Sequence, residues 1–285
     1  MNTSRRNFIK NAGVLLGGST LLSQLPVNAF GAEKFGPNKF GFQVWTIREE
    51  LVKDFHGTLH MMEKLGYKQV EMCSPLGYES SGFGPLNKMS GTEMKKIIDD
   101  TGLKCVSSHY GMGELRDSLE NRIEWATQLG MKQMICSSFW LPEGTMDEYL
   151  KACDELNEMG EKTKAAGIQM GFHNHNMEFE KRNGKLIYDT LMERLDPDLV
   201  KMQFQVAVID IGYKAADYFR KYPGRFISAH LADWSSAKKE QVPLGQGVVD
   251  WEDLFKAAKV GGVKNYFVEM APETFKESAE FLKKV

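Results

Sequence analysis

The 285-residue sequence predicts one α/β domain, a (β/α)8 barrel, behind an N-terminal extension. Three observations predict this organisation: a helix–glycine–strand unit that recurs along the chain, a length that suits eight such units, and an N-terminus whose composition differs from the rest. About 250 residues is the usual size of a (β/α)8 barrel. The chain is 42% hydrophobic and 26% charged, which is typical of a globular domain.

The recurring unit is an amphipathic helix that ends in a glycine and is followed by a short apolar run. A glycine after a helix end adopts the left-handed conformation at little cost. The apolar run is typical of a strand that is buried on both faces. The unit occurs at residues 62–72, 98–109, 126–138, 163–175 and 257–270, with the glycines Gly66, Gly102, Gly130, Gly167 and Gly262.

The remaining elements fit around these five units. The run "KFGFQVW" (39–45) supplies a first strand, and two more strands, at 200–206 and 224–233, fit the long gap before the last unit. A final helix follows at 273–284, which gives eight strands, each followed by a helix. A doubly wound open sheet is the alternative, but no glycine-rich phosphate-binding fingerprint follows the first strand.

The N-terminus has the order of an export signal. Paired arginines, Arg5 and Arg6, precede an apolar run (12–25) and the small-residue stretch "PVNA", which ends at Ala29. The arginine pair resembles a twin-arginine signal. An ordinary secretory signal or an uncleaved N-terminal anchor is the alternative. We therefore expect residues 1–29 to be a twin-arginine signal peptide and 30–285 the barrel, with the twin-arginine export machinery as a partner and the periplasm as the destination.

Charge argues against one class of partner. The formal net charge is −2, and no basic stripe with interleaved aromatic residues occurs. Proteins that bind nucleic acids usually carry such a stripe, so we expect no nucleic-acid partner. An oligomer is compatible with the sequence but is not indicated by it.

The predicted strand ends collect polar side chains. In (β/α)8 barrels the functional residues lie at the C-terminal ends of the strands. Four of the six histidines fall there, and strand alternation places His173 and His175 on one face. Imidazole and carboxylate groups together are typical ligands of Zn²⁺ and related ions. This pattern indicates a metal site; the alternative is that "HNH" (173–175) is a hydrogen-bonded rim motif without metal. In chain order the strand ends carry Gln43 with Trp45, Glu71, His109, Ser137 or Ser138, His173 with His175, Gln205, His230 with Asp233, and Glu269.

Three stretches give the chain a family resemblance. They are "GFHNHNMEF" (171–179), "YPGRFISAHLAD" (222–233) and "GQGVVDWEDLFKAAKVGGVKNYFVEM" (245–270). In this order they resemble the xylose isomerase-like TIM barrel superfamily, often labelled sugar phosphate isomerase/epimerase, and the resemblance covers nearly the whole barrel. It implies one divalent ion held by Glu, Asp, His and Glu from strands five to eight.

The ligand positions depart from that family pattern in two places. His230 and Glu269 match the seventh-strand and eighth-strand ligands, but His173 stands in place of Glu and Gln205 in place of Asp. The resemblance therefore implies a metal site of His173, Gln205, His230 and Glu269 that is more neutral by two charges. Such a site favours Mn²⁺, Zn²⁺, Co²⁺ or Ni²⁺ over Mg²⁺.

The resemblance also implies an isomerase or epimerase that removes a proton next to a carbonyl group. The candidate bases are Glu71, His109 and Glu269, because a base needs a tunable pKa and access to the cavity. Phosphorylated sugars are mainly intracellular, so export favours a non-phosphorylated sugar or keto-sugar. Two alternatives remain: a lyase or hydratase acting on oxidised sugars or glycosides, and a sugar-binding barrel without catalysis. The expected substrate contacts are His175, Trp45 and Asp233.

Overall fold

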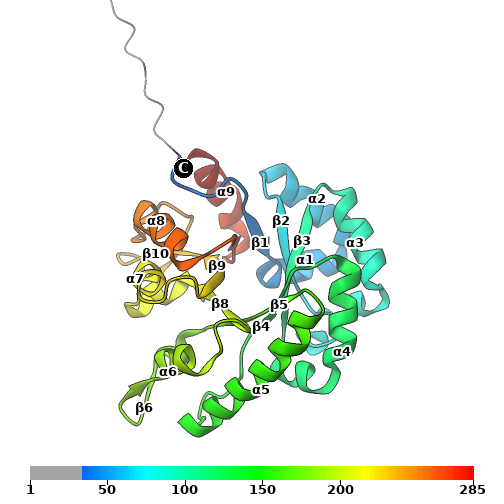
Figure 1. The fold of residues 1–285 in the computed structure, drawn as a ribbon. Coiled ribbons are helices and arrows are strands. Elements are labelled where there is room, and N and C mark those ends of the chain that lie inside the picture. Colours follow the sequence, from blue (N-terminus) through cyan, green and yellow to red (C-terminus); the bar gives the residue numbers. More distant parts are fainter. Residues whose placement is uncertain (1–33) are drawn as a thin grey trace, which may run out of the picture. The chain divides into compact units, whose positions relative to one another are not determined.

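The computed structural model describes residues 34–285, and its strands close into an eight-stranded parallel barrel (Figure 1). Their order around the barrel is β1-β12-β9-β8-β5-β4-β3-β2. The predicted (β/α)8 barrel is therefore confirmed, whereas the predicted signal peptide (1–29) lies outside the described residues. The barrel strands are β1 (Gly41–Gln43), β2 (Gln69–Cys73), β3 (Lys104–Tyr110), β4 (Gln133–Cys136), β5 (Gln169–His173), β8 (Val200–Gln205), β9 (Phe226–Leu231) and β12 (Asn265–Val268).

Helices follow every barrel strand and surround the barrel (Figure 1). All five glycines that were predicted to end helices have a positive φ, which confirms the repeated helix–glycine–strand design. No helix within residues 34–285 is both long and apolar enough to cross a membrane. The helices are α1 (Arg48–Lys53), α2 (Phe55–Leu65), α3 (Gly91–Asp100), α4 (Met112–Leu129), α5 (Met146–Ala165), α6 (Ile187–Arg194), α7 (Ala215–Lys221), α8 (Trp251–Gly261) and α9 (Phe275–Lys284).

The barrel interior is polar where an aliphatic layer is more usual. Glu71, Ser107, Gln203 and Ser228 are completely buried there, and they form hydrogen bonds with one another. Alternate residues of the same strands, such as Phe204, belong to the hydrophobic core. The strands thus hold a layer of polar groups inside the barrel.

Short irregular elements follow the C-terminal ends of the strands and shape the mouth of the barrel. Two are antiparallel hairpins: β6 (Lys181–Arg182) with β7 (Lys185–Leu186), and β10 (Asp233–Ser235) with β11 (Glu240–Val242). The others are 3-10 helices at Trp45–Ile47, Glu79–Ser81, Gly84–Lys88, Asn176–Phe179, Val206–Ile211 and Pro272–Thr274.

Candidate functional site

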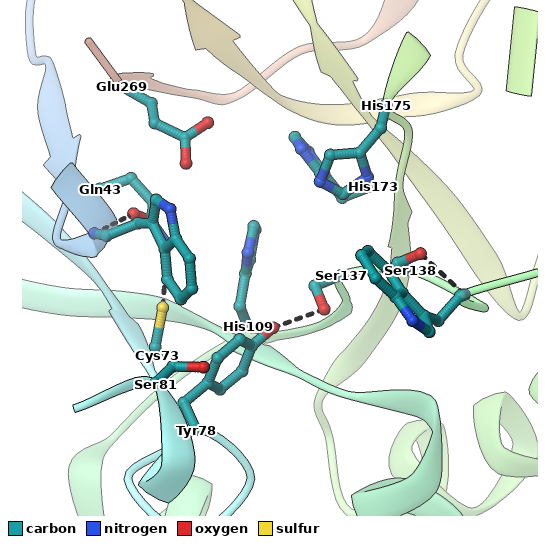
Figure 2. Close-up of a pocket in the computed structure, with 12 residues that line it drawn as sticks. Gln43, Cys73, Tyr78, Ser81, His109, Ser137, Ser138, His173, His175 and Glu269 are labelled. Atoms are coloured by element: carbon teal, nitrogen blue, oxygen red, sulfur yellow. Dashed lines mark hydrogen bonds between the residues drawn. The ribbon is translucent and has the colours of Figure 1, made fainter. Parts of the chain in front are cut away.

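A cavity of about 300 Å³ opens at the C-terminal ends of the strands. Five of the predicted site residues line it: Trp45, His109, His173, His175 and Glu269. Figure 2 shows the side chains of the last four facing the same space. The other lining residues are Gln43, Cys73, Tyr78, Ser81, Ser137, Ser138 and Trp140.

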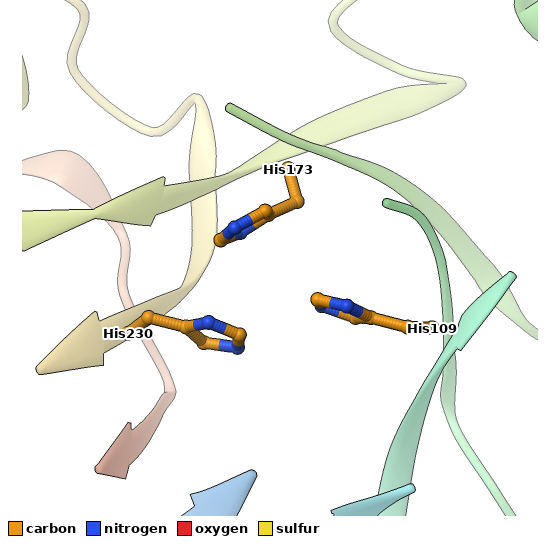
Figure 3. Close-up of side chains that lie close together, drawn as sticks. All are labelled: His109, His173 and His230. Atoms are coloured by element: carbon orange, nitrogen blue, oxygen red, sulfur yellow. The ribbon is translucent and has the colours of Figure 1, made fainter. Parts of the chain in front are cut away.

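Three histidines converge on one point (Figure 3). His109 and His173 line the cavity, and His230, which is completely buried, lies against both; this cluster is called the floor of the cavity below. His109 comes from β3, His173 from β5 and His230 from β9. Their ring centroids lie 4.5 to 5.1 Å apart, and one ring nitrogen of each lies within 4.8 Å of the others. Each of the three is a residue that the sequence places at a strand end. Strands that are distant in the sequence therefore bring three imidazoles to one point.

His230 lies between two carboxylates. Its Nε2 is hydrogen-bonded to Glu71, and its Nδ1 lies 2.9 Å from Oε2 of Glu269. Burial would lower the pKa of His230, but the two carboxylates outweigh it and raise the pKa to about 9. Without a metal ion, both ring nitrogens therefore carry a proton at neutral pH, and the proton on Nδ1 is shared with Glu269.

Glu71 lies below the histidines inside the barrel and is not among the residues that line the cavity. Ser107 Oγ donates to it at 2.6 Å and Gln203 Nε2 at 2.8 Å, in addition to His230. Burial would raise the pKa of Glu71, but His109 and His230 together lower it, so the carboxylate stays ionised. This position favours a role in orienting His230 over the predicted role as a base in contact with substrate.

The contacts of His109 define its tautomer. Its Nε2 lies 2.7 Å from Oε1 of Gln203, whose amide group donates to Glu71 and Ser228. Because the amide oxygen can only accept, Nε2 of His109 carries the hydrogen and Nδ1 carries the lone pair. Burial lowers the pKa of His109, so the ring is neutral at pH 7. His109 therefore provides a neutral imidazole in the cavity wall.

Glu269 and Gln205 face each other beside His230. Nε2 of Gln205 donates to Oε2 of Glu269 at 2.7 Å, and its Oε1 accepts from the backbone N–H of Ala207 at 3.3 Å. Burial would raise the pKa of Glu269, but His230 lowers it to about 2. Glu269 is thus a permanent carboxylate. In this arrangement the amide oxygen of Gln205, the atom predicted to bind the metal, is turned to the backbone.

Asp233 lies apart from the cavity, although the sequence predicts a substrate contact there. Its carboxylate accepts hydrogen bonds from the backbone N–H groups of Trp234, Gly245, Gly247 and Val249, at 2.9 to 3.2 Å. Nε1 of Trp251 donates to it at 3.0 Å. With five donors on a buried carboxylate, this geometry favours a structural role: Asp233 fixes the loop between β9 and α8. The side chain follows its strand but turns into the loop and not toward the cavity.

Among the described residues, the ring nitrogens of His109, His173 and His230 form the group that could hold a divalent metal ion. Nδ1 of His173 and Nδ1 of His175 are buried and have no hydrogen-bond partner among the described residues. Nδ1 of His230 and Oε2 of Glu269, 2.9 Å apart, share a hydrogen bond in this structure, and Nδ1 becomes a metal ligand only when it loses its proton. Glu71 is hydrogen-bonded to Nε2, the other ring nitrogen of His230. A carboxylate at this position commonly orients a metal-binding histidine.

A closed parallel barrel with its polar cluster at the C-terminal strand ends defines the TIM barrels. A family model described as xylose isomerase-like TIM barrel matches residues 59–285, which is most of the sequence. The chain belongs to the xylose isomerase-like TIM barrel family.

Solved structures share this fold. Two sugar phosphate isomerase/epimerases from Parabacteroides distasonis ATCC 8503 are similar to the chain. The first has a TM-score of 0.74 at 24% sequence identity, and the match covers 89% of this chain and 96% of the chain in that structure. The second has a TM-score of 0.72 at 26% identity and covers 87% and 98%. The IOLI protein, solved with a zinc atom, has a TM-score of 0.57 at 16% identity over 86% and 94%. None of the curated proteins matches the sequence.

Sequence reasoning missed the polar layer below the histidines. Ser107, Gln203 and Ser228 each precede a strand-end residue by two positions, at 109, 205 and 230. Side chains two apart in a strand share a face, so a polar residue at that spacing is the signal that could have found them. Their hydrogen bonds hold Glu71 and His109, which in turn orient the cavity floor.

Proposed function

We propose that this protein is a divalent-metal-dependent enzyme, isomerase-like or epimerase-like, that removes a proton next to the carbonyl group of a non-phosphorylated sugar. The observation that carries the proposal is the cluster of His109, His173 and His230 with Glu269 at the floor of the cavity. We further propose that the paired arginines near the N-terminus direct the protein to the twin-arginine export route. Export agrees with a substrate that is not phosphorylated.

The cavity wall supports a neutral substrate. Among the described residues that line it, none is lysine or arginine. Proteins hold phosphate with arginine, lysine or a helix N-terminus, because the charge must be met by strong donors. Serine hydroxyls, the Tyr78 hydroxyl and indole rings suit the hydroxyl groups and C–H faces of a sugar. The sugar phosphates in the names of the two similar structures are therefore less suitable ligands here than neutral sugars.

His173, His230 and Glu269 would hold the ion, and His175, whose buried Nδ1 has no hydrogen-bond partner among the described residues, is a further candidate donor. The donor set, two or three imidazoles and one carboxylate, favours Zn²⁺, Mn²⁺, Co²⁺ or Ni²⁺. A bound ion would polarise the carbonyl group next to the reacting carbon. Glu71 would keep the proton on Nε2 of His230 and so leave Nδ1 free for the ion.

His109 is the base that the geometry supports best. Its ring is neutral, its Nδ1 carries a lone pair, and it lines the cavity. Glu269, with a pKa of about 2, is a weak base and better suited as a ligand. His109 would take the proton from the carbon next to the carbonyl group onto Nδ1 and return it on the same face to the former carbonyl carbon, while the hydroxyl proton passes from one oxygen to the other, which gives isomerisation. Epimerisation would need a second proton donor on the opposite face of the substrate. Gln203 would hold the ring in place throughout.

Proton exchange tests this proposal directly. The purified protein is analysed for metals and then incubated in D₂O with neutral aldoses and ketoses, while deuterium at the carbon next to the carbonyl group is followed by NMR. We expect near-stoichiometric metal and exchange on at least one sugar. Loss of a leaving group together with exchange would identify a lyase instead. Bound metal without exchange on any sugar would reject the enzyme and favour a sugar-binding barrel.

Two variants separate the roles of the histidines. His109→Gln should abolish exchange and keep the metal, whereas loss of metal as well would make His109 a ligand. His56→Gln changes an exposed histidine of α2 that does not line the cavity, and it serves as the matched control.

A further inference from the structure

Trp140 combines two unfavourable features at the rim of the cavity. Its side chain is 75% exposed, the largest value among the exposed large apolar residues that the structure describes. Its backbone has a φ of +52°, in the left-handed region that a tryptophan rarely adopts. A left-handed backbone at a large residue costs stability and occurs disproportionately at binding sites, and an exposed indole that lines a cavity offers its face to a ligand.

The segment around Trp140 is fixed from several sides. The preceding ring, Phe139, is buried against Phe172 of β5 with the centroids 4.4 Å apart. Oγ of Ser138 accepts from the backbone N–H of Trp140 at 2.8 Å. The hydroxyl group of Tyr149 donates to the carbonyl oxygen of Leu141 at 2.7 Å. The indole is therefore held out at the rim by contacts that do not involve the indole itself.

Trp140 lies farther out than the reacting groups. The three histidines of the floor are at most 5% exposed, whereas Trp140, which lines the same cavity, is largely in solvent. A sugar whose carbonyl carbon meets His109 would occupy the floor. The indole at the exposed rim would instead contact a substituent of the sugar that points out of the cavity.

The other indole of the cavity, that of Trp45, packs mainly against residues of the protein. Trp45 is half-buried, packs against Tyr78 and Phe83, and has the guanidinium of Arg48 4.8 Å from its ring centroid. Its contacts are thus largely satisfied within the protein. Trp140 is the indole of the cavity that keeps its surface available for a ligand.

From these observations we infer that Trp140 is the platform of an outer subsite, and that the substrate is a sugar joined to a second neutral ring, which stacks on Trp140. The inference rests on the proposed function, because it takes the occupant of the cavity to be a sugar. A flat apolar face is what an indole recognises, and either a second sugar or an aromatic aglycone offers one. The lack of lysine and arginine among the described lining residues makes that ring neutral.

Calorimetric titration of the full-length protein tests the subsite without relying on catalysis. The disaccharides cellobiose, maltose and lactose are each compared with glucose, which has the same free carbonyl group in its open form, and the 4-nitrophenyl glucosides are compared with the methyl glucosides. We expect the parent to prefer the two-ring member of at least one pair. Trp140→Ala should reduce that preference, the ratio of the two Kd values, about tenfold, while Trp140→Phe retains most of it.

Two further variants keep the outcome clear. Trp140→Gly removes the indole at a φ that glycine adopts readily, so it should fold at least as well as the parent and lose the preference. Met61→Ala, in α2, removes an exposed apolar side chain that does not line the cavity and should leave the preference unchanged.

The results divide without ambiguity. Preference only for the 4-nitrophenyl glucosides supports an aromatic outer ring, and preference for the disaccharides supports a sugar. Equal binding within every pair by the parent, or equal ratios in parent and Trp140→Gly, overturns the subsite. So does sedimentation that shows a dimer in the parent and a monomer in Trp140→Gly, because a second copy would then cover the ring. Failure of the proposed function would appear separately, as absence of exchange in D₂O.

Discussion

Replacing Asp233 with alanine should lower the free energy of unfolding. Asp233 does not line the cavity, so we expect no direct effect on substrate binding. Its carboxylate accepts four backbone N–H groups and Nε1 of Trp251. Gly245 and Gly247 are exposed, so their N–H groups would find water in the variant. Trp251 is buried, and its Nε1–H would lose its partner, at about 1–3 kcal/mol. The backbone donors should lose less, so we expect the free energy of unfolding to fall by about 3 kcal/mol in total.

The assay is thermal unfolding followed by circular dichroism. For a domain of this size, each kcal/mol lowers Tm by about 2–4 °C, so Asp233→Ala should lower it by roughly 6–12 °C. Asp250→Ala is the matched control from the same loop, because Asp250 accepts one hydrogen bond, from Asp253 N–H, at the start of α8. That variant should lose about 1 kcal/mol. An unchanged Tm together with weaker sugar binding in Asp233→Ala would refute this reasoning and restore Asp233 as a substrate contact.

Four other predictions concern the pH dependence of stability, metal binding and export. Burial raises the pKa of Glu114 to about 7, above about 4.3 in an unfolded chain. Its contribution to stability is therefore lost as pH rises from about 4 to 7. Glu114→Gln should be about 3–4 kcal/mol more stable than the parent at pH 8 and equal to it at pH 4 in urea unfolding, and equal stability at both would contradict the burial effect. His230→Ala should abolish metal binding and activity, as measured by mass spectrometry of the metal content; metal retained at the parent level would place the ion elsewhere. Gln205→Ala should lower metal affinity by no more than about 10–100-fold, whereas Gln205→Asp should tighten binding and shift the preference toward Mn²⁺ or Mg²⁺; weaker binding in the aspartate variant would contradict the idea that a carboxylate is missing there. Changing Arg5 and Arg6 together to lysine should leave the precursor in the cytoplasm on cell fractionation, and normal export would reject the twin-arginine route.

The barrel fold is encoded by local patterns in the sequence. A strand buried on both faces needs an apolar run, a helix that packs on it needs an apolar stripe, and the turn between them needs a glycine with positive φ. Each of these requirements acts over a few neighbouring residues, as at Gly66 and Gly130. Five repeats of one local pattern were therefore enough to predict the barrel. The strand-end histidines followed from it, because parallel strands share one C-terminal edge.

The directions and partners of the side chains depended on the tertiary structure. His230 and Glu71 are 159 positions apart, and Gln203 and Glu71 are 132 apart. Nothing local in the sequence distinguishes Glu71, which ends below the histidines, from Glu269, which ends in the cavity.

Asp233 shows most clearly which features the sequence predicts and which depend on the tertiary structure. Its place just after a strand was predictable, but its five donors come from residues up to 18 positions away. These donors lie in the loop between β9 and α8 and at the start of α8. Periodicity along the chain thus determined the barrel and which residues reach its mouth. Closure of the barrel decided which of them meet, because a hydrogen bond or a pKa shift depends on distances of a few ångströms between side chains remote in sequence.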